Sequence, residues 1–240
     1  MLDFGLSDEQ RLIRDLARRF SREVIAPAAA EHDRTGEFPV SIGRQAFELG
    51  LLNTGVPEEY GGPGLGVVDL CLLREELAWG CSGITSAITI GNLAAAPVLV
   101  AGTHEQKARW LRPLTEDFRI AAYALTEPDA GSDVGAIRAR ACRQGDQYVL
   151  NGTKRWISGA GVAEWFVVFA KTDPEAGRRG LSAFIVPRNA PGLSVGKKED
   201  MMGQRASYTA EVILEDVTVP EHYRLGQEGQ GWTIAMETLN

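Results

Sequence analysis

The stretch best suited to chemistry runs from Tyr123 to Asp133 and reads YALTEPDAGSD. It follows a short apolar run that ends at Leu125, and it then becomes a loop of hydroxyls, small residues and acids. Such a loop offers backbone N–H groups, to which Thr126 and Ser132 add two hydroxyls, so it could bind a polar heterocycle or a phosphate. The same composition is also typical of a well-capped turn.

A second stretch, NGTKRWISG from Asn151 to Gly159, places a tryptophan and a hydroxyl two residues apart. Residues at this spacing on a strand point to the same face. Trp156 would then offer an aromatic plane with the Ser158 hydroxyl beside it, a combination that suits a planar redox ring. A core tryptophan with a polar neighbour would give the same pattern.

Generic cofactor and nucleophile motifs are not found. Gly62, Gly64 and Gly66 resemble a dinucleotide-binding loop, but the third glycine of that fingerprint would fall on Val67. The sequence has no Walker motif and no nucleophile elbow. Three isolated histidines are predicted to be surface or capping residues: His32, His104 and His222.

Composition indicates a folded, acidic protein. The 240 residues are 44% hydrophobic and 24% charged, with 25 basic and 32 acidic side chains, which gives a net charge of −7. Because no basic block occurs, nucleic acid is an unfavourable partner. An anionic cofactor remains possible, since single arginines and helix N-termini bind phosphates whatever the net charge.

Cysteine usage and hydropathy favour a cytoplasmic location. The three cysteines, Cys71, Cys81 and Cys142, have neither disulfide-framework nor zinc-site spacing. The N-terminus has no signal-peptide pattern. The most apolar stretch, residues 84–101, is interrupted by hydroxyls, Gly91, Asn92 and Pro97, so it predicts a buried helix and no membrane span.

The first half of the chain is predicted to be helical. Ser7 with Gln10, and Thr103 with Gln106, form capping boxes that each begin a helix. Further helices are expected over residues 39–50 and 67–80, with a glycine-rich loop over 60–66. The apolar face of the first helix is expected to comprise Leu12, Ile13, Leu16, Ala17 and Phe20.

From about Arg119 the hydrophobic period becomes two, which predicts strands. Asn151-Gly152 lies between short apolar runs and predicts a hairpin turn. Short strands at this spacing favour an antiparallel barrel or sandwich, and helices followed by strands indicate an α+β multidomain fold. Further strands are expected over Trp165–Ala170, Leu181–Val186 and Ala210–Leu214.

After Gly229 the pattern returns to an amphipathic helix, with Trp232, Ala235, Met236 and Leu239 on one face. The helix reaches the last residue without a cap, so we expect the natural protein to continue. Three domains are therefore predicted. These are an all-α domain over residues 1–118, a β domain over 119–225, and the first turns of a C-terminal helical domain over 226–240.

The two chemical stretches resemble the two flavin-site signatures of the acyl-CoA dehydrogenases. The patterns are Tyr-x-Leu-Thr-Glu-Pro-x-Ala-Gly-Ser-Asp from Tyr123, and Asn-Gly-x-Lys-x-Trp-Ile-Ser from Asn151. The segments MGQR at 202–205 and VTVP at 217–220 are similar to later motifs of that family. The likeness runs in register from Ser7 to the last residue.

This resemblance implies a set of FAD-binding residues. Thr126 would place its hydroxyl or amide near the flavin N5 region, Trp156 would pack against the ring, and Ser158 would bond its edge. Gly131 and Ser132 would cover the cofactor edge, with Ser132 also touching the CoA arm. The full set is Tyr123, Leu125, Thr126, Gly131, Ser132, Trp156, Ile157 and Ser158.

Within the family, three segments most resemble the medium-chain enzymes: residues 31–38, 48–53 and 75–81. Two positions depart from that pattern. Thr89 stands where those enzymes carry an acid near the fatty-acyl end of the pocket, and Asn240 stands where they carry an aspartate near CoA. Together with Ser132, these two residues are the implied substrate contacts.

The implied reaction is FAD-dependent α,β-dehydrogenation of acyl-CoA thioesters to trans-2-enoyl-CoA, in fatty-acid β-oxidation or related catabolism. Electrons would pass to electron-transferring flavoprotein, and Leu65 resembles the hydrophobic anchor that docks this partner. An exposed leucine is also common on ordinary surface. The family resemblance further implies a homotetramer for the full-length protein.

No glutamate matches the catalytic base of the family, so none is assigned, and the base is expected beyond Asn240. Glu127, Asp133 and Glu237 are carboxylates, but none stands where the resemblance places the base. Glu127, in a Thr-Glu-Pro turn, is interpreted as structural. The adenine end of FAD would also depend on the absent domain.

Two alternatives stay open. An acyl-CoA oxidase or flavin-dependent monooxygenase on the same scaffold would pass electrons to oxygen. A non-catalytic fragment that binds only FAD or CoA would carry out no redox chemistry.

Overall fold

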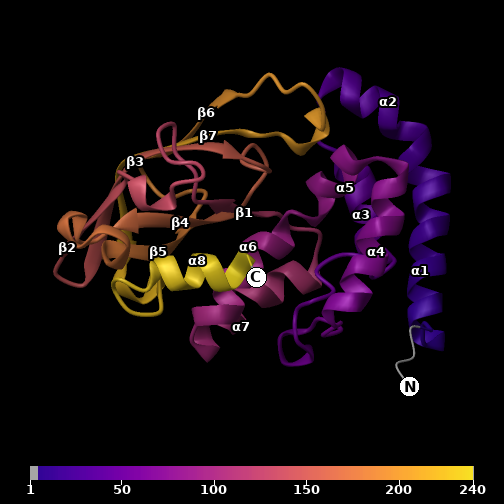
Figure 1. The fold of residues 1–240 in the computed structure, drawn as a ribbon, viewed down its shortest axis with the longest axis horizontal. Coiled ribbons are helices and arrows are strands. Elements are labelled where there is room, and N and C mark those ends of the chain that lie inside the picture. The colour runs from indigo at the N-terminus through magenta and orange to yellow at the C-terminus, as the bar shows by residue number, and fades with distance from the viewer. Residues whose placement is uncertain (1–4, 240) are drawn as a thin grey trace. The chain divides into compact units, whose positions relative to one another are not determined.

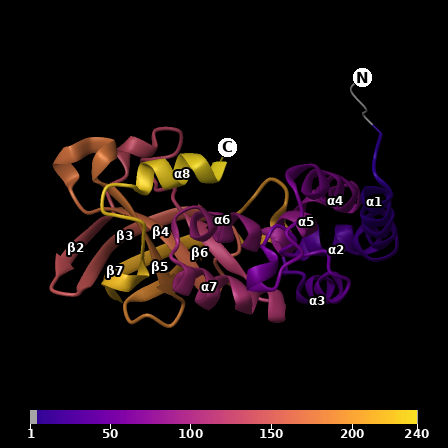
Figure 2. The same ribbon diagram turned by 90° about the horizontal axis from the view of Figure 1, so that it is seen from below.

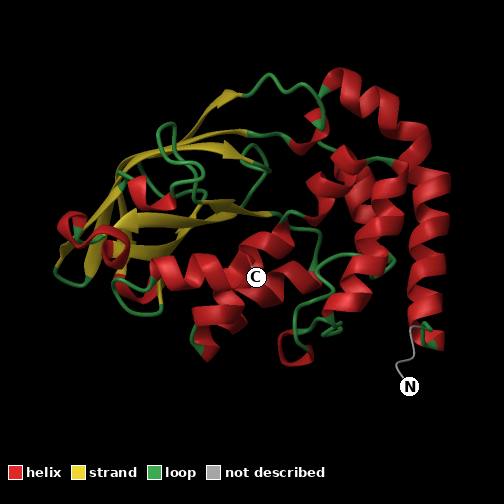
Figure 3. Ribbon diagram, viewed as in Figure 1, coloured by secondary structure: helices red, strands yellow, loops and turns green. Residues whose placement is uncertain are grey.

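The computed structural model describes residues 5–239 and divides the chain into two compact units (Figure 1). The helical unit comprises residues 1–89 with Met201–Ser207, and the sheet unit comprises Ile90–Asp200 with residues 208–240. Helices followed by a sheet confirm the predicted α+β class (Figure 3). The domain boundaries after residues 118 and 225 stay predictions.

The helical unit is built on α1, Asp8–Phe20, which packs against α4, Val67–Gly80. Both predicted capping boxes are confirmed, and in the first the Ser7 hydroxyl accepts from the Gln10 N–H at 3.1 Å. The apolar face was predicted too broadly, because Leu12 is 71% exposed while Ala17 and Phe20 are buried. The other elements are a π-helical turn Ser21–Ile25, α2 Ala26–Thr35, α3 Val40–Glu48, a 3₁₀ turn Glu58–Tyr60 and α5 Ser82–Thr89.

The sheet unit is an eight-stranded sheet with three described helices beside it (Figure 2). The strands follow the order β6-β7-β3-β2-β4-β5-β8, and β1 pairs with β4. The prediction of an antiparallel sheet is wrong in one respect, because β1 and β2 pair with β4 in parallel and make the sheet mixed. The strands are β1 Ala121–Ala124, β2 Arg140–Gln144, β3 Gln147–Ile157, β4 Trp165–Lys171, β5 Leu181–Pro187, β6 Leu193–Lys198, β7 Ala210–Pro220 and β8 Arg224–Leu225.

Strands β4 and β5 form the core of this unit, since nearly every residue in both is buried. Continuous burial matches their apolar sequences, which show no alternation. Helix α6, Gly91–Ala101, packs on β1 and β4, and α8, Gly231–Leu239, packs on β5 and α6. Helix α7, His104–Glu116, packs on α6.

The predicted hairpin at Asn151-Gly152 is wrong, because β3 runs straight through this pair. The β2–β3 turn lies at Gly145, where φ is 63°. Gly152 instead marks a bulge opposite β7, and a Cβ there would lie 2.6 Å from the Ala139 Cβ. The glycine is therefore needed for a close approach within the sheet, and the Asn151 amide hydrogen-bonds to Asp216 at 2.9 Å.

The buried face of the last helix shares only Ala235 with the predicted face of Trp232, Ala235, Met236 and Leu239. Gly231, Ile234 and Ala235 are buried, whereas Leu239 is 57% exposed. A Cβ at Gly231 would lie within 2.7 Å of the Leu181 backbone, so the helix approaches β5 closely at this point.

The apolar stretch Ser82–Ala101 meets the length and composition of a membrane span, with a mean hydropathy of 1.7. Half of it is buried inside the structure, as the core helix of a folded domain would be. A turn at Ile90 separates α5 from α6, and each helix buries apolar residues in its own unit. The predicted burial agrees with these observations, but the prediction of a single helix is wrong, because the stretch forms two.

Candidate functional site

The two chemical stretches meet in the sheet unit. Leu125 and Thr126 directly follow β1, and Arg155 lies near the end of β3. The Arg155 N–H donates to the Thr126 carbonyl at 2.9 Å. Segments that are about thirty residues apart in the chain are thus joined by a main-chain hydrogen bond.

A buried ion pair lies directly behind this junction. Lys154 is fully buried, and its Nζ donates to Glu127 Oε1 at 2.7 Å and to the Leu125 carbonyl at 3.0 Å. Glu127 also accepts from the backbone N–H groups of Arg138 and Ala139 at 2.7 and 3.0 Å. Burial lowers the pKa of Lys154 to about 8, and the Glu127 carboxylate opposes this shift. These contacts support the structural interpretation of Glu127.

Trp156 is displayed by an irregular piece of backbone. A register shift lies between Lys154 and Ile157, and Trp156 has φ of 61°, which is uncommon for a bulky side chain. The regular alternation that we assumed for Trp156 and Ser158 is therefore wrong. The bulge leaves Trp156 50% exposed, with the Arg155 guanidinium 5.0 Å from its ring centroid. Arg155 is in turn held by Glu199 at 2.8 Å.

Hydroxyl groups lie on both motifs. The Tyr123 ring packs against Phe169 at 5.1 Å, and its hydroxyl is buried with no hydrogen-bond partner among the described residues. Burial raises the pKa of Tyr123. Ser158 follows β3, with its Oγ 3.4 Å from the Thr209 hydroxyl. An exposed aromatic plane, accessible hydroxyls and an orphaned buried phenol fit a planar heterocycle with polar edges.

The remaining predicted contacts differ in exposure. Ile157 and Leu125 are buried, whereas Gly131 and Ser132 lie in an exposed loop. Thr89 is buried in the helical unit, where its hydroxyl donates to the Thr85 carbonyl at 2.8 Å. Asn240 lies outside the described residues.

Asp133 and Glu237, the other two carboxylates compared with the family's catalytic base, have ordinary surroundings. Asp133 caps a 3₁₀ turn by accepting from the Gly135 N–H at 3.1 Å, and Glu237 is exposed on α8. Leu65 is partly exposed, and its N–H donates to the Thr54 carbonyl at 2.8 Å. Across residues 5–239, no group of three or more His, Cys, Asp or Glu side chains could hold a metal ion.

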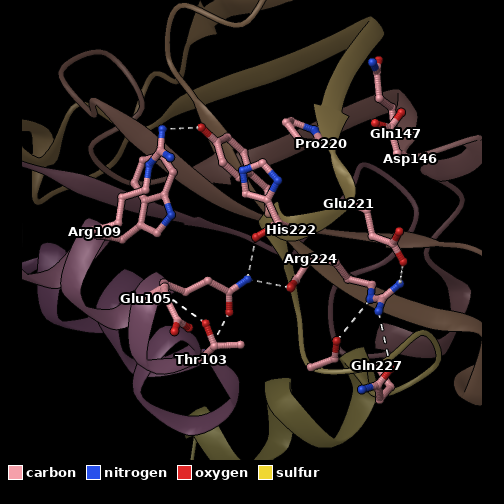
Figure 4. A pocket seen from close by; sticks show the side chains of 14 residues that line it. Thr103, Glu105, Arg109, Asp146, Gln147, Pro220, Glu221, His222, Arg224 and Gln227 are labelled. Carbon is pink, nitrogen blue, oxygen red and sulfur yellow. Dashed lines mark hydrogen bonds and ion pairs between the residues drawn. The ribbon is translucent and has the colours of Figure 1, made fainter.

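A cavity of about 880 Å³, which the sequence did not predict, lies among α7, the β2–β3 turn and the segment after β7 (Figure 4). Arg109 stacks over Trp110 and Tyr223 and donates to the Tyr223 hydroxyl at 2.7 Å. The Gln106 amide donates to two backbone carbonyls of the same wall at 2.8 Å. None of the residues predicted to bind flavin or substrate lines this cavity. Its residues come from three distant segments, so no local pattern could have indicated it.

A helical domain followed by a mixed-sheet domain, with the two motifs joined at one site, matches two consecutive family models. The acyl-CoA dehydrogenase N-terminal domain matches residues 7–117, and the acyl-CoA dehydrogenase middle domain matches residues 122–217. The chain belongs to the acyl-CoA dehydrogenase family, as the resemblance predicted.

Similar proteins support this assignment. A probable medium-chain specific acyl-CoA dehydrogenase of Caenorhabditis briggsae is 44% identical over the whole chain, and an acryloyl-CoA reductase (NADH) of Anaerotignum propionicum is 43% identical. The butyryl-CoA dehydrogenase structure from Megasphaera elsdenii superposes with a TM-score of 0.94 at 38% identity, over 99% of this chain and 63% of that one. The chain spans 59% and 61% of the lengths of the two curated relatives.

Proposed function

We propose that this chain forms the flavin-binding and acyl-CoA-binding part of an FAD-dependent acyl-CoA dehydrogenase. The observation that carries the proposal is the hydrogen-bonded junction of the two motifs, with Trp156 displayed beside it in a strained conformation. Strain of this kind persists where the surrounding structure enforces it, and it is frequent at ligand sites. Membership of the family supports the same reading.

In this proposal Trp156 packs against the isoalloxazine ring of FAD, and Ser158 bonds its edge. Thr126 faces the reactive part of the ring from the other motif, and Ser132 contacts both the cofactor edge and the CoA arm. The exposed loop around Ser132 leaves its hydroxyl accessible for this role. The complete proposed set is Tyr123, Leu125, Thr126, Gly131, Ser132, Trp156, Ile157 and Ser158, with Thr89 and Asn240 as substrate contacts.

Bound FAD would accept the β hydrogen of the acyl-CoA as hydride, after which a trans-2-enoyl-CoA remains. The residues of this chain hold and orient the ring and keep water from one of its faces. The base that removes the α proton is proposed to lie outside this chain, since Glu127 is already fully engaged by Lys154 and two backbone N–H groups.

The proposal also covers the substrate, the electron acceptor and the assembly of the complete protein. Medium-chain thioesters are the preferred substrates in this proposal, and relatives at 42–44% identity include both medium-chain and short-chain enzymes. Electron-transferring flavoprotein is the proposed acceptor, docking through Leu65. A related structure, with a TM-score of 0.95, comes from work on such a flavoprotein of Acidaminococcus fermentans. A cytoplasmic homotetramer completes the proposal.

The test is to express the protein from its complete reading frame and to record its absorption spectrum. We expect flavin bands that bleach on anaerobic addition of medium-chain acyl-CoA, and a Trp156→Ala variant should retain less FAD. Rapid oxygen consumption by the reduced protein would instead identify an oxidase or a monooxygenase. A colourless protein that binds no added FAD would refute the proposal in favour of a non-catalytic role.

A further inference from the structure

We infer that Lys154 is a positioning residue that fixes and polarises the peptide between Leu125 and Thr126, so that the Thr126 N–H becomes a stronger hydrogen-bond donor to the flavin. The inference rests on the proposed function and adds a role that the motif residues in direct contact with the ring do not have. Lys154 would act through the peptide and would not touch the cofactor.

Lys154 is hydrogen-bonded to the peptide group that carries the Thr126 N–H. The Lys154 ammonium donates to the Leu125 carbonyl at 3.0 Å, and this carbonyl and the Thr126 N–H are the two ends of one peptide group. On the other side of Thr126, its own carbonyl accepts the Arg155 N–H at 2.9 Å. Lys154 and Arg155, which are consecutive residues of β3, therefore hold the peptide groups on both sides of Thr126. These two peptide groups have little freedom to rotate.

The positive charge of Lys154 polarises this peptide group. A hydrogen bond from a charged donor is stronger than a neutral one, and hydrogen bonds in a chain polarise one another. Withdrawing electrons from the Leu125 oxygen makes the N–H at the far end of the same peptide more positive. No hydrogen bond among residues 5–239 uses the Thr126 N–H, so this donor is available to a ligand.

Glu127 keeps the Lys154 ammonium charged inside the protein. A buried amine without a partner would lose its proton, whereas here the carboxylate opposes that loss at 2.7 Å. Two backbone N–H groups fix the carboxylate in place. The pair is thus a rigid dipole whose positive end is bonded to the flavin-site peptide.

The consequence concerns the reduction potential of a bound flavin. A flavin gains negative charge when it is reduced, and a strengthened donor stabilises the charged form more than the neutral one. Removing the positive end of the dipole should therefore lower the potential. Removing its negative end should lower the potential as well, because the buried amine then loses the carboxylate that keeps it charged.

The experiment compares the complete wild-type protein, loaded with FAD, with its Lys154→Met and Glu127→Gln variants. We expect Lys154→Met to lower the ratio of reduced to oxidised flavin at a fixed potential about tenfold, which is about 30 mV for a two-electron couple. Glu127→Gln should also lower the midpoint potential, because the Lys154 amine loses the carboxylate that keeps it protonated. Val219→Ala, a buried change on β7 opposite Tyr148, is the control for lost stability and should leave the potential unchanged.

A second measurement follows the peptide itself. In protein labelled with ¹⁵N-threonine, the Thr126 amide proton of the FAD-free form should move upfield in Lys154→Met and stay near its wild-type position in Val219→Ala. If Lys154→Met does not fold, the sign of the Glu127→Gln shift still decides, because an unchanged or raised potential there contradicts the role given to the charged ammonium.

The outcomes separate the two proposals. Failure of the wild-type protein to bind FAD would refute the proposed function, and the flavin part of this inference with it. Bound FAD whose potential is the same in the wild type and in Lys154→Met, or is not lowered in Glu127→Gln, would refute this inference alone.

Discussion

The buried pair of Lys154 and Glu127 should contribute strongly to the stability of the sheet unit, and Lys154→Met measures that contribution. Methionine fills nearly the same volume, so the change removes a charge without opening a large cavity. It leaves a carboxylate that is 6% exposed with no cation, and it leaves the Leu125 carbonyl without its ammonium donor. Breaking one side of a buried pair costs about 3–5 kcal/mol. Because two backbone N–H groups still solvate the carboxylate, we expect the loss to lie near about 3 kcal/mol, at the lower end of that range.

Urea unfolding at pH 7, followed by tryptophan fluorescence, is the assay, combined with Glu127→Gln in a double-mutant cycle. The two changes act on one interaction, so we expect a coupling energy of about 1–3 kcal/mol. Lys171→Met, on the partly exposed end of β4, is the matched control and should change stability by less than about 0.5 kcal/mol.

Two results would contradict this reasoning. A loss in Lys154→Met no larger than that in Lys171→Met would mean that the buried ammonium contributes nothing beyond its methylenes. Additive effects of Lys154→Met and Glu127→Gln would mean that the two groups are stabilised independently, by the backbone and not by each other.

Three further changes test other parts of the structure. Gly152→Ala should destabilise the protein by about 2–3 kcal/mol in thermal unfolding, because its Cβ would lie 2.6 Å from that of Ala139. Gly203→Ala, which has open space around it, is the control and should leave the melting temperature nearly unchanged. Tyr123→Phe should remove an alkaline loss of stability. Burial raises the pKa of Tyr123, so above about pH 10 the unfolded chain releases a proton that the folded one retains. Urea titrations from pH 9 to 11 should show a falling curve for the wild type and a flatter one for the variant, and parallel curves would contradict this. Ser7→Ala should cost about 1 kcal/mol by removing the cap of α1, and an unchanged midpoint would show that the cap contributes nothing.

Local features of the fold were predictable from the sequence. The capping boxes at Ser7 and Thr103 and the helix over Val67–Gly80 depend on residues three or four apart, and the structure confirms all of them. The strands over Trp165–Lys171 and Leu181–Pro187 were predicted to within one residue at each end, because each is a compact apolar run bounded by turn residues.

Features set by pairing partners were not predictable. Asn151-Gly152 has the composition of a hairpin turn, but the chain stays extended because β7 pairs with β3 along its length and Asp216 hydrogen-bonds to the Asn151 side chain. The buried face of α8 depends in the same way on the Leu181 backbone, which no residue near Gly231 in the sequence could reveal. Both errors come from long-range contacts that override a short-range preference.

The bulge in β3 explains why the second motif can serve both the interior and the surface. In a regular strand Lys154 and Trp156 would point to the same face, so one could not be fully buried while the other is half exposed. The register shift and the positive φ of Trp156 break that alternation. Lys154 can then reach inward to the Leu125 carbonyl while the indole turns outward, and the Arg155 N–H between them is left to bond Thr126. The strain at Trp156 is therefore the structural condition for joining the two motifs, and a change that restored regular pairing here should disrupt both of their contacts together.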